Sequence, residues 1–247
     1  WPLATLYAFE YMTHEGHEKS FFLFYIMTYG VTLGVAFASD MLSMYFFYEL
    51  LTLVTVPLVM HTLKREAILA VRKYLYFSLG GAAFALMGMI FLMVYGETCE
   101  FTLGGVFSAE ALAKHGQLLL WIYLFSFMGF GVKAAIFPTS GWLPQAGVAP
   151  TPVTALLHAV AVVNAGAFAI IRLTYYSFGA DFLRGSWVQT VFMILTLITV
   201  GKMLEARSKG KTTDALKGLM KLSPKTAVLV KDGQEEEVPI EQVQKDD

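Results

Sequence analysis

Long apolar stretches, separated by short polar ones, make up most of this chain. A helix needs roughly 20 mostly apolar residues to cross a bilayer. Six stretches approach that length, at about 20–38, 41–63, 74–95, 117–137, 151–173 and 187–205. Backbone that crosses hydrocarbon must satisfy its own hydrogen bonds, which favours helices. The pattern therefore predicts an all-α polytopic membrane bundle of about six transmembrane helices, in contact with the lipid bilayer.

The composition supports a membrane protein and excludes several other classes. Hydrophobic residues make up 56% of the chain and charged residues 15%, a balance well outside that of soluble domains. The net charge of −1 is not typical of a nucleic-acid partner. Cys99 is the only cysteine, so an intramolecular disulfide and every multi-cysteine metal site are excluded. We expect no cofactor, no metal site and no nucleic-acid partner.

Basic residues predict the orientation in the membrane. Lys64, Arg65, Arg72 and Lys73 lie between the second and third stretches, whereas the 96–116 loop carries three glutamates against one lysine. Basic loops stay in the cytoplasm, so we expect the first loop inside and the second outside. The same alternation places the C-terminal part inside.

Ionisable residues interrupt three of the apolar stretches. Glu49 lies near the middle of the second stretch, where a carboxylate costs roughly 3 kcal/mol on insertion scales and indicates a functional site. A structural ion pair, or a glutamate that faces water in a crevice of the bundle, is the alternative. Lys133 lies near the end of the fourth stretch, where a lysine can also extend to the headgroups. His158 is either a core residue or a proton carrier, because histidine titrates near neutral pH.

Glycine and proline surround Lys133 and predict a broken helix. Gly131 loosens the backbone and Pro138 cannot continue the hydrogen-bond ladder, so we expect the fourth helix to end or kink between them. Pro144, Pro150 and Pro152 should keep the next loop non-helical. Irregular backbone at membrane depth is tolerated where it lines a cavity or is buried in protein, and it marks ion sites in transporters.

Two further polar residues have ordinary structural explanations. Asn164, six residues after His158, can form hydrogen bonds between helices. Trp142, in the proline-containing loop, is typical of a residue at the membrane interface.

These residues together resemble a known family. Ser39, Asp40 and Glu49, and then the run from Lys133 to Arg172, are similar to motifs of the proton-translocating, antiporter-like subunits of respiratory complex I, Mrp cation/proton antiporters and membrane-bound hydrogenases. The run reads Lys-x-x-x-Phe-Pro, Trp-Leu-Pro, Ala-Pro-x-Pro-Val-x-Ala-Leu-Leu-His and a final Leu-Arg. The resemblance covers roughly residues 1–189.

The resemblance implies roles for the matching residues. Glu49 and Lys133 would be the pair whose separation gates proton uptake, facing each other across a polar cleft, and His158 in the same cleft would pass the proton on. The family has a second lysine where this chain has Asn164, so that relay position is doubtful. The family also has about fourteen helices in two repeats, of which this chain holds about one.

The resemblance also implies partner proteins, a transported ion and a cellular location. We expect other membrane subunits of a respiratory NADH:quinone oxidoreductase, Mrp or hydrogenase-type complex as partners, protons as the transported ion with sodium as a second candidate, and a bacterial or archaeal cytoplasmic membrane. No catalytic residue is implied, and whether the parent complex is an oxidoreductase stays open. A non-transporting scaffold protein is an alternative, favoured by Asn164.

Residues 190–247 resemble a different family, the copper-transporting P-type ATPases. The match covers the membrane helix that leads into the actuator domain and that domain's first strands. We expect a helix to about Leu204, a separate amphipathic helix near 211–222 and a hairpin at Asp232-Gly233, which together form a small cytoplasmic α/β tail.

The ATPase resemblance brings no chemistry. The chain lacks the Cys-Pro-Cys, Asp-Lys-Thr-Gly and Thr-Gly-Glu motifs of these pumps. We therefore interpret the chain as two domains, an antiporter-like transmembrane domain at 1–189 and an incomplete ATPase segment at 190–247, joined as a chimera. A genuine fusion and a fragment of a copper ATPase are the alternatives.

Overall fold

The computed structural model describes the backbone of residues 1–222, 226–231 and 234–239, and the side chains of residues 1–205. The chain divides into two compact units, Trp1–Leu197 and Ile198–Asp247.

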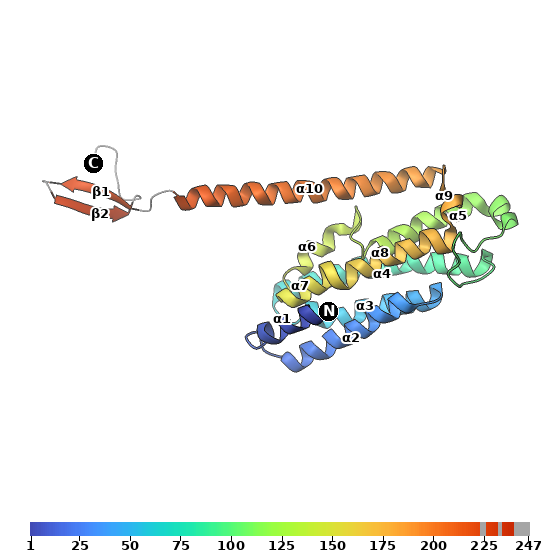
Figure 1. Cartoon of the computed structure of the whole chain (residues 1–247), viewed down its shortest axis with the longest axis horizontal. Helices are drawn as coiled ribbons and strands as arrows, with labels where there is room; N and C mark the ends of the chain where they lie inside the picture. Colours follow the sequence, from blue (N-terminus) through green and yellow to red (C-terminus); the bar gives the residue numbers. More distant parts are fainter. Residues whose placement is uncertain (223–225, 232–233, 240–247) are drawn as a thin grey trace. The chain divides into compact units, whose positions relative to one another are not determined.

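The first unit is a helical bundle (Figure 1). Its long helices are α2 (Glu18–Phe37), α3 (Met41–Val59), α4 (Arg65–Tyr95) and α5 (Ala109–Gly131), preceded by a short α1 (Pro2–Met12). Short elements follow: η1 (Thr139–Trp142), α6 (Leu143–Ala146), α7 (Thr151–Ala155), η2 (Leu156–Val160), α8 (Val162–Ile171), η3 (Arg172–Phe178) and α9 (Ala180–Leu183). Of these, η1 is a 3₁₀ helix and η2 and η3 are π-helices.

Helix length and hydropathy confirm the polytopic membrane bundle. Within the described residues, five segments are long and apolar enough to cross a membrane: Glu18–Phe37, Met41–Val59, Arg65–Tyr95, Thr151–Phe178 and Trp187–Glu205. The sixth predicted span, 117–137, corresponds to α5, which is not among these five. Its first turns carry Glu110, Lys114 and Gln117, which lower its hydropathy.

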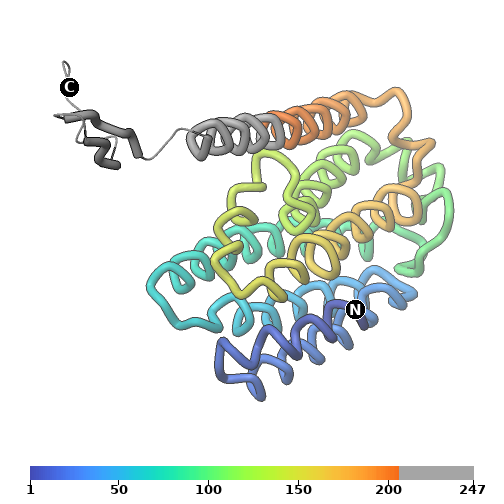
Figure 2. The backbone as a smooth tube through the Cα atoms, turned by 60° about the vertical axis from the view of Figure 1, so that its left-hand side comes forward, coloured from blue at the N-terminus to red at the C-terminus, as the bar shows by residue number. Residues whose placement is uncertain are grey.

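The bundle places α8 against the long helices. Helix α4 packs along α5 and α2 along α3, while α8 contacts α2, α3 and α5 (Figure 2). Backbones approach closely where small residues meet, since a Cβ on Gly129 would lie 2.6 Å from the carbonyl oxygen of Gly81. Such small-residue contacts are typical of helices packed in membranes.

The loop after α4 is tied to one end of the bundle. Phe101 N–H donates to the Ser39 carbonyl at 3.1 Å, and Val106 N–H donates to the Ser177 carbonyl at 3.0 Å. The loop therefore joins the end of α2 to η3.

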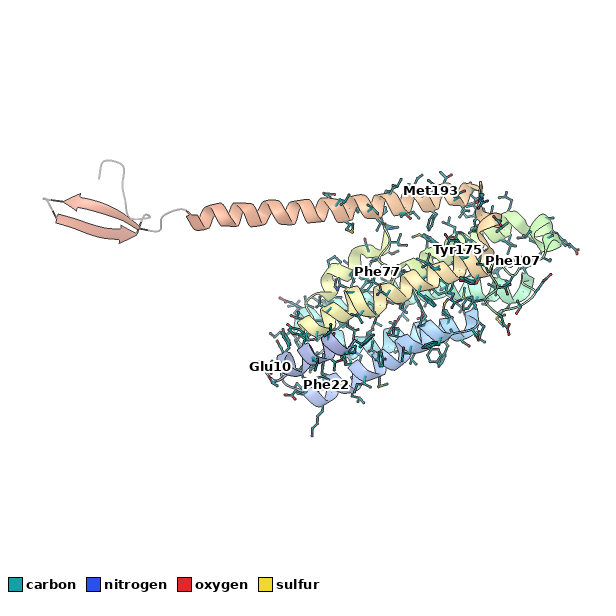
Figure 3. All side chains as sticks on the ribbon, viewed as in Figure 1. Glu10, Phe22, Phe77, Phe107, Tyr175 and Met193 are labelled. Atoms are coloured by element: carbon teal, nitrogen blue, oxygen red, sulfur yellow. The ribbon has the colours of Figure 1, made fainter. Side chains whose placement is uncertain are left out.

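Helix α10 (Trp187–Leu222) begins in the first unit. Trp187 packs on Trp121 at 4.6 Å between ring centroids, and Phe192 packs on Phe127 at 4.8 Å. Met193 and Tyr175, both labelled in Figure 3, lie near this start of α10. They are among the residues that line a hollow there.

The C-terminal elements confirm one prediction and correct another. Strands β1 (Thr226–Lys231) and β2 (Gln234–Pro239) form an antiparallel hairpin, as predicted, although Asp232-Gly233 lies outside the described residues. Helix α10 is continuous to Leu222, so the predicted separation into a helix to Leu204 and another at 211–222 is wrong. The lysine, arginine, glutamate and alanine residues between those positions are good helix formers, and no proline interrupts them.

Candidate functional site

Glu49 and Lys133 lie on two elements that meet in the bundle core. Glu49 lies within α3, and Lys133 follows the end of α5 at Gly131. The chain then leaves the helical path, since Ile136 N–H donates to the Gly131 carbonyl at 3.0 Å and Ala135 has a φ of 54°. The helix ends at the glycine, as predicted from the Gly131 and Pro138 pattern.

The structure brings the two charges together. Lys133 Nζ lies 3.7 Å from Glu49 Oε1, with the lysine side chain 1% exposed and the glutamate side chain 23% exposed. Burying one of these charges alone would be costly, whereas a pair compensates part of the desolvation. The remaining desolvation cost must be offset by hydrogen bonds and contacts from neighbouring residues.

Tyr48 completes the surroundings of the lysine. Lys133 Nζ donates a hydrogen bond to the Tyr48 carbonyl and lies 3.4 Å from the centroid of the Tyr48 ring. The phenol O–H of Tyr48 donates to the Phe130 carbonyl at 2.9 Å. This residue was missed from the sequence, where its position next to an intramembrane carboxylate is the only available signal.

Trp142 holds the broken segment. Its indole N–H donates to the Val132 carbonyl at 2.7 Å, and its ring packs on Tyr74 at 4.9 Å. It is fully buried, so the prediction of an interface residue is wrong. The indole satisfies a carbonyl at the end of α5 that no longer has a regular helical partner.

The three prolines of the loop after Trp142 lie at or directly before the starts of short helices. Pro144 lies in the first turn of α6 and Pro152 in the first turn of α7, with Pro150 directly before α7. The loop is thus partly helical, contrary to the expectation, because proline fits the first turn, where no N–H is needed.

His158 lies in a second interruption. It belongs to η2, is half-buried, and its Nδ1 lies 2.9 Å from the Thr154 carbonyl oxygen. The helix breaks at Ala161, which has φ −122° and ψ −72°. Within the described residues, no hydrogen bond or ion pair joins His158 to Glu49 or Lys133.

Asn164 stabilises this second interruption. Its Nδ2 donates to the Ala159 carbonyl at 2.8 Å, and its side chain is exposed. The expected hydrogen bond between helices is replaced by one within its own segment.

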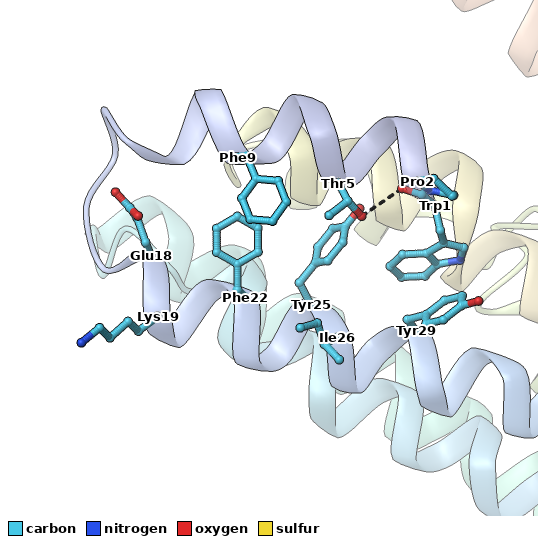
Figure 4. A pocket seen from close by; sticks show the side chains of 10 residues that line it. All are labelled: Trp1, Pro2, Thr5, Phe9, Glu18, Lys19, Phe22, Tyr25, Ile26 and Tyr29. Carbon is cyan, nitrogen blue, oxygen red and sulfur yellow. Dashed lines mark hydrogen bonds between the residues drawn. The ribbon is translucent and has the colours of Figure 1, made fainter.

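The bundle also contains a hollow that has no buried charged side chain in its lining. It lies between α1 and α2 and has a volume of about 520 Å³, and half of its lining residues are aromatic, among them Phe9 and Phe22 (Figure 4). Its charged residues, Glu18 and Lys19, are exposed. In the part of the chain that the structure describes, no group of three or more His, Cys, Asp or Glu residues could hold a metal ion.

These features define a polytopic helical membrane protein that buries an acid–base pair beside a helix break. Comparison with known families identifies the group. Residues 38–224 match the family described as NADH:quinone oxidoreductase/Mrp antiporter, TM, and the chain belongs to this family. The match continues past residue 190, so the family resemblance is longer than the predicted 1–189.

Individual relatives agree with the family. The chain is 30% identical over 223 residues to an Na(+)/H(+) antiporter subunit of Alkalihalophilus pseudofirmus, covering 90% of this chain and 26% of that protein. It is 29% identical over 199 residues to the antiporter protein of the same name from Bacillus subtilis, covering 79% and 24% respectively. The chain thus spans about a quarter of the length of these relatives.

One solved structure shares the fold. It comes from the membrane-bound sulfane sulfur reductase, an archaeal respiratory membrane complex, with a TM-score of 0.59 and 23% identity, covering 69% of this chain and 34% of that chain.

Proposed function

We propose that this chain is a proton-conducting part of an Na⁺/H⁺ antiporter-like membrane subunit, in which Glu49 and Lys133 take up and release a proton. The observation that carries the proposal is the fully buried Lys133 ammonium, 3.7 Å from the Glu49 carboxylate and beside a helix break. A buried ammonium is favoured only while a carboxylate lies near it. Movement of Glu49 away from Lys133 would therefore release the proton.

The proposed relay continues at His158. Imidazole can both accept and donate a proton near neutral pH, and His158 lies in an irregular segment of the bundle. Asn164 cannot carry a proton charge, and its amide is used by the Ala159 carbonyl. Beyond His158 the proton therefore travels through water or through a neighbouring protein of the complex.

The names of the relatives support a proposal for the partners, the coupled ion and the location. They are named as subunits of Na(+)/H(+) antiporters, so we propose other membrane subunits as partners, sodium as the coupled ion and the bacterial cytoplasmic membrane as the location. The complete transport path belongs to a protein about four times as long.

Transport by the full-length protein, assembled in its complex and reconstituted in liposomes, tests the proposal. Lys133→Ala should abolish sodium-dependent proton movement, followed with an internal pH-sensitive dye. Lys19→Ala, at an exposed lysine of α2, is the matched control and should transport at the wild-type rate. Transport that survives Lys133→Ala would reject the assignment, provided the variant assembles.

Two alternatives have supporting observations. The Asn164 hydrogen bond within its own segment favours a non-transporting scaffold, which Lys133→Ala with unchanged transport would support. The β1–β2 hairpin after a long helix was expected from the resemblance of residues 190–247 to a copper ATPase. The ATPase resemblance and the chimeric junction stay predictions. The family match, which extends to residue 224, argues against both. Independent reads of the coding DNA across codons 180–200 test them.

A further inference from the structure

A line of buried hydroxyl groups runs from Glu49 between α3 and α4. Thr52 and Thr55 follow Glu49 on α3, and Tyr74 and Ser78 lie one turn apart on α4. Residues three or four positions apart share a helix face. All four hydroxyl residues are at most 3% exposed, so this line lies inside the bundle.

The hydroxyl groups are close enough to interact in sequence. Thr55 Oγ1 lies 2.9 Å from the Tyr74 phenol oxygen. Either hydroxyl can be the donor in this contact, so a proton can pass from Thr55 to Tyr74. Thr52 lies three residues before Thr55 on α3 and Ser78 four residues after Tyr74 on α4, and neither hydroxyl has a hydrogen-bond partner among the described residues.

Three oxygen atoms on this line have no hydrogen-bond partner among the described residues. They are Thr52 Oγ1, Ser78 Oγ and Glu49 Oε1, and all three are buried. Glu49 Oε1 forms the ion pair with Lys133 Nζ, but the 3.7 Å distance is too long for a hydrogen bond. A buried polar atom without a partner costs about 1–3 kcal/mol, and nearly all such atoms in native proteins are satisfied by protein or water. Buried waters in proteins typically bind to such otherwise unsatisfied polar groups.

We propose that Thr52, Thr55, Tyr74 and Ser78, with water between them, form the entry path by which protons reach Glu49. The inference rests on the proposed function. A hydroxyl group can accept one hydrogen bond while donating another, so the line can pass a proton by exchange. One proton is bound by a Glu49 carboxylate oxygen for each proton that the line takes from solvent, and every hydroxyl returns to its neutral form.

The direction of the path follows from the helix ends. Thr55 lies four residues before the end of α3 at Val59, and α4 begins at Arg65. The basic residues of that connection predict the cytoplasmic side. The order from the cytoplasm is therefore Thr55 and Tyr74, then Thr52 and Ser78, then Glu49. Trp142 packs on the Tyr74 ring of this line.

Removal of hydroxyls without loss of volume tests the path. In the full-length protein in its membrane, infrared difference spectroscopy follows the hydrogen–deuterium exchange of the protonated Glu49 carboxyl, assigned by its absence in Glu49→Gln. We expect Thr52→Val combined with Ser78→Ala to slow the exchange at least tenfold, and Thr52→Ser to restore it. If the double variant does not assemble, Tyr74→Phe is measured instead, with the same expected slowing.

The control is another buried threonine. Thr28 is fully buried in α2 and donates to the Phe24 carbonyl of its own helix at 2.7 Å, so Thr28→Val should exchange at the wild-type rate. Exchange of the Glu49 carboxyl at the wild-type rate in the double variant or in Tyr74→Phe would overturn the path. That result would leave the proposed function standing, whereas transport retained by Lys133→Ala would reject the function.

Discussion

The two helix interruptions of the bundle differ in their sequence but are stabilised in the same way. The interruption that carries Lys133 follows Gly131 and precedes a proline, whereas the one that carries His158 contains neither glycine nor proline between residues 156 and 161. In each, one side-chain N–H donates to a carbonyl of the broken segment, at 2.7 Å from Trp142 and at 2.8 Å from Asn164. A membrane helix can thus be broken without a breaking residue, if its carbonyls find other donors.

The helix after the second interruption, α8, touches the first interruption. A Cβ on Gly166 of α8 would lie 2.7 Å from the carbonyl carbon of Lys133 and 2.9 Å from Ala134 Cα. Only glycine permits this approach. The helix that follows the second interruption therefore rests on the backbone of the first.

Gly166→Ala should have the largest effect on this arrangement. The added methyl group must displace backbone atoms, so we expect a loss of about 3 kcal/mol in the free energy of unfolding. Denaturation in mixed detergent micelles measures it. Gly80→Ala is the control, because a Cβ there meets nothing within 4 Å, and it should be neutral or stabilising by up to about 1 kcal/mol. Equal stability of the two variants would show that α8 does not rest on the first interruption.

Trp142→Phe removes the donor at the first interruption. The Val132 carbonyl keeps only the Ala135 N–H at 3.1 Å and a small void forms beside Tyr74, so we expect a loss of about 2 kcal/mol. Trp121→Phe changes a half-exposed ring and should cost about 0.5 kcal/mol or less. A similar loss in both variants would mean that the indole hydrogen bond contributes nothing specific.

The difference between the two interruptions shows which parts of the fold could be predicted from the sequence. The apolar stretches predicted the spans, because hydropathy over about 20 residues is a local property, and Gly131 predicted the first interruption. The interruption at Ala161 was not predicted, because it depends on the Asn164 amide and on the contact of Gly166 with another element. Short α1 was also missed, since its 11 residues are too few to give a span signal.

The candidate site was predictable only in part. Glu49 and Lys133 are conspicuous because charges in apolar stretches are costly, and the structure places them together. The contribution of Tyr48 depends on its carbonyl and ring both reaching Lys133, which is a tertiary property. The hydroxyl line is also invisible in the sequence, where each threonine resembles an ordinary helix residue.

Asn164→Ala should have a smaller effect, at the second interruption. Loss of the donor to the Ala159 carbonyl should cost about 1 kcal/mol, because the exposed site lets water replace it in part. Thr196→Ala is the matched control: its exposed hydroxyl donates to the Phe192 carbonyl at 2.9 Å in an unbroken helix. That variant should change the unfolding free energy little. An equal loss in both variants would contradict a special role of Asn164.

The smallest effect is expected at a regular helix terminus, the start of α3, which serves as a reference for both interruptions. Asp40 caps this helix, accepting hydrogen bonds at 2.8 Å from both the N–H and the hydroxyl of Ser43. Burial raises the pKa of the Asp40 carboxyl, but the hydrogen bonds from Ser43 and Ser39 outweigh it and hold that pKa below its ordinary value. The ionised cap therefore stabilises the fold above the ordinary pKa near 4, and this contribution is lost as the pH falls through the lower folded-state value.

Asp40→Ala should accordingly cost about 0.5–1 kcal/mol at pH 7. Asp40→Asn keeps an acceptor oxygen but cannot titrate, so its unfolding free energy relative to wild type should improve when the pH is lowered from 7 to 3. Unfolding measured at both pH values checks the sign. A difference between Asp40→Asn and wild type that does not change with pH would mean that the carboxylate charge is not what caps α3. The start of α3 would then be stabilised by neutral hydrogen bonds alone, as the two interruptions are by the Trp142 and Asn164 N–H groups.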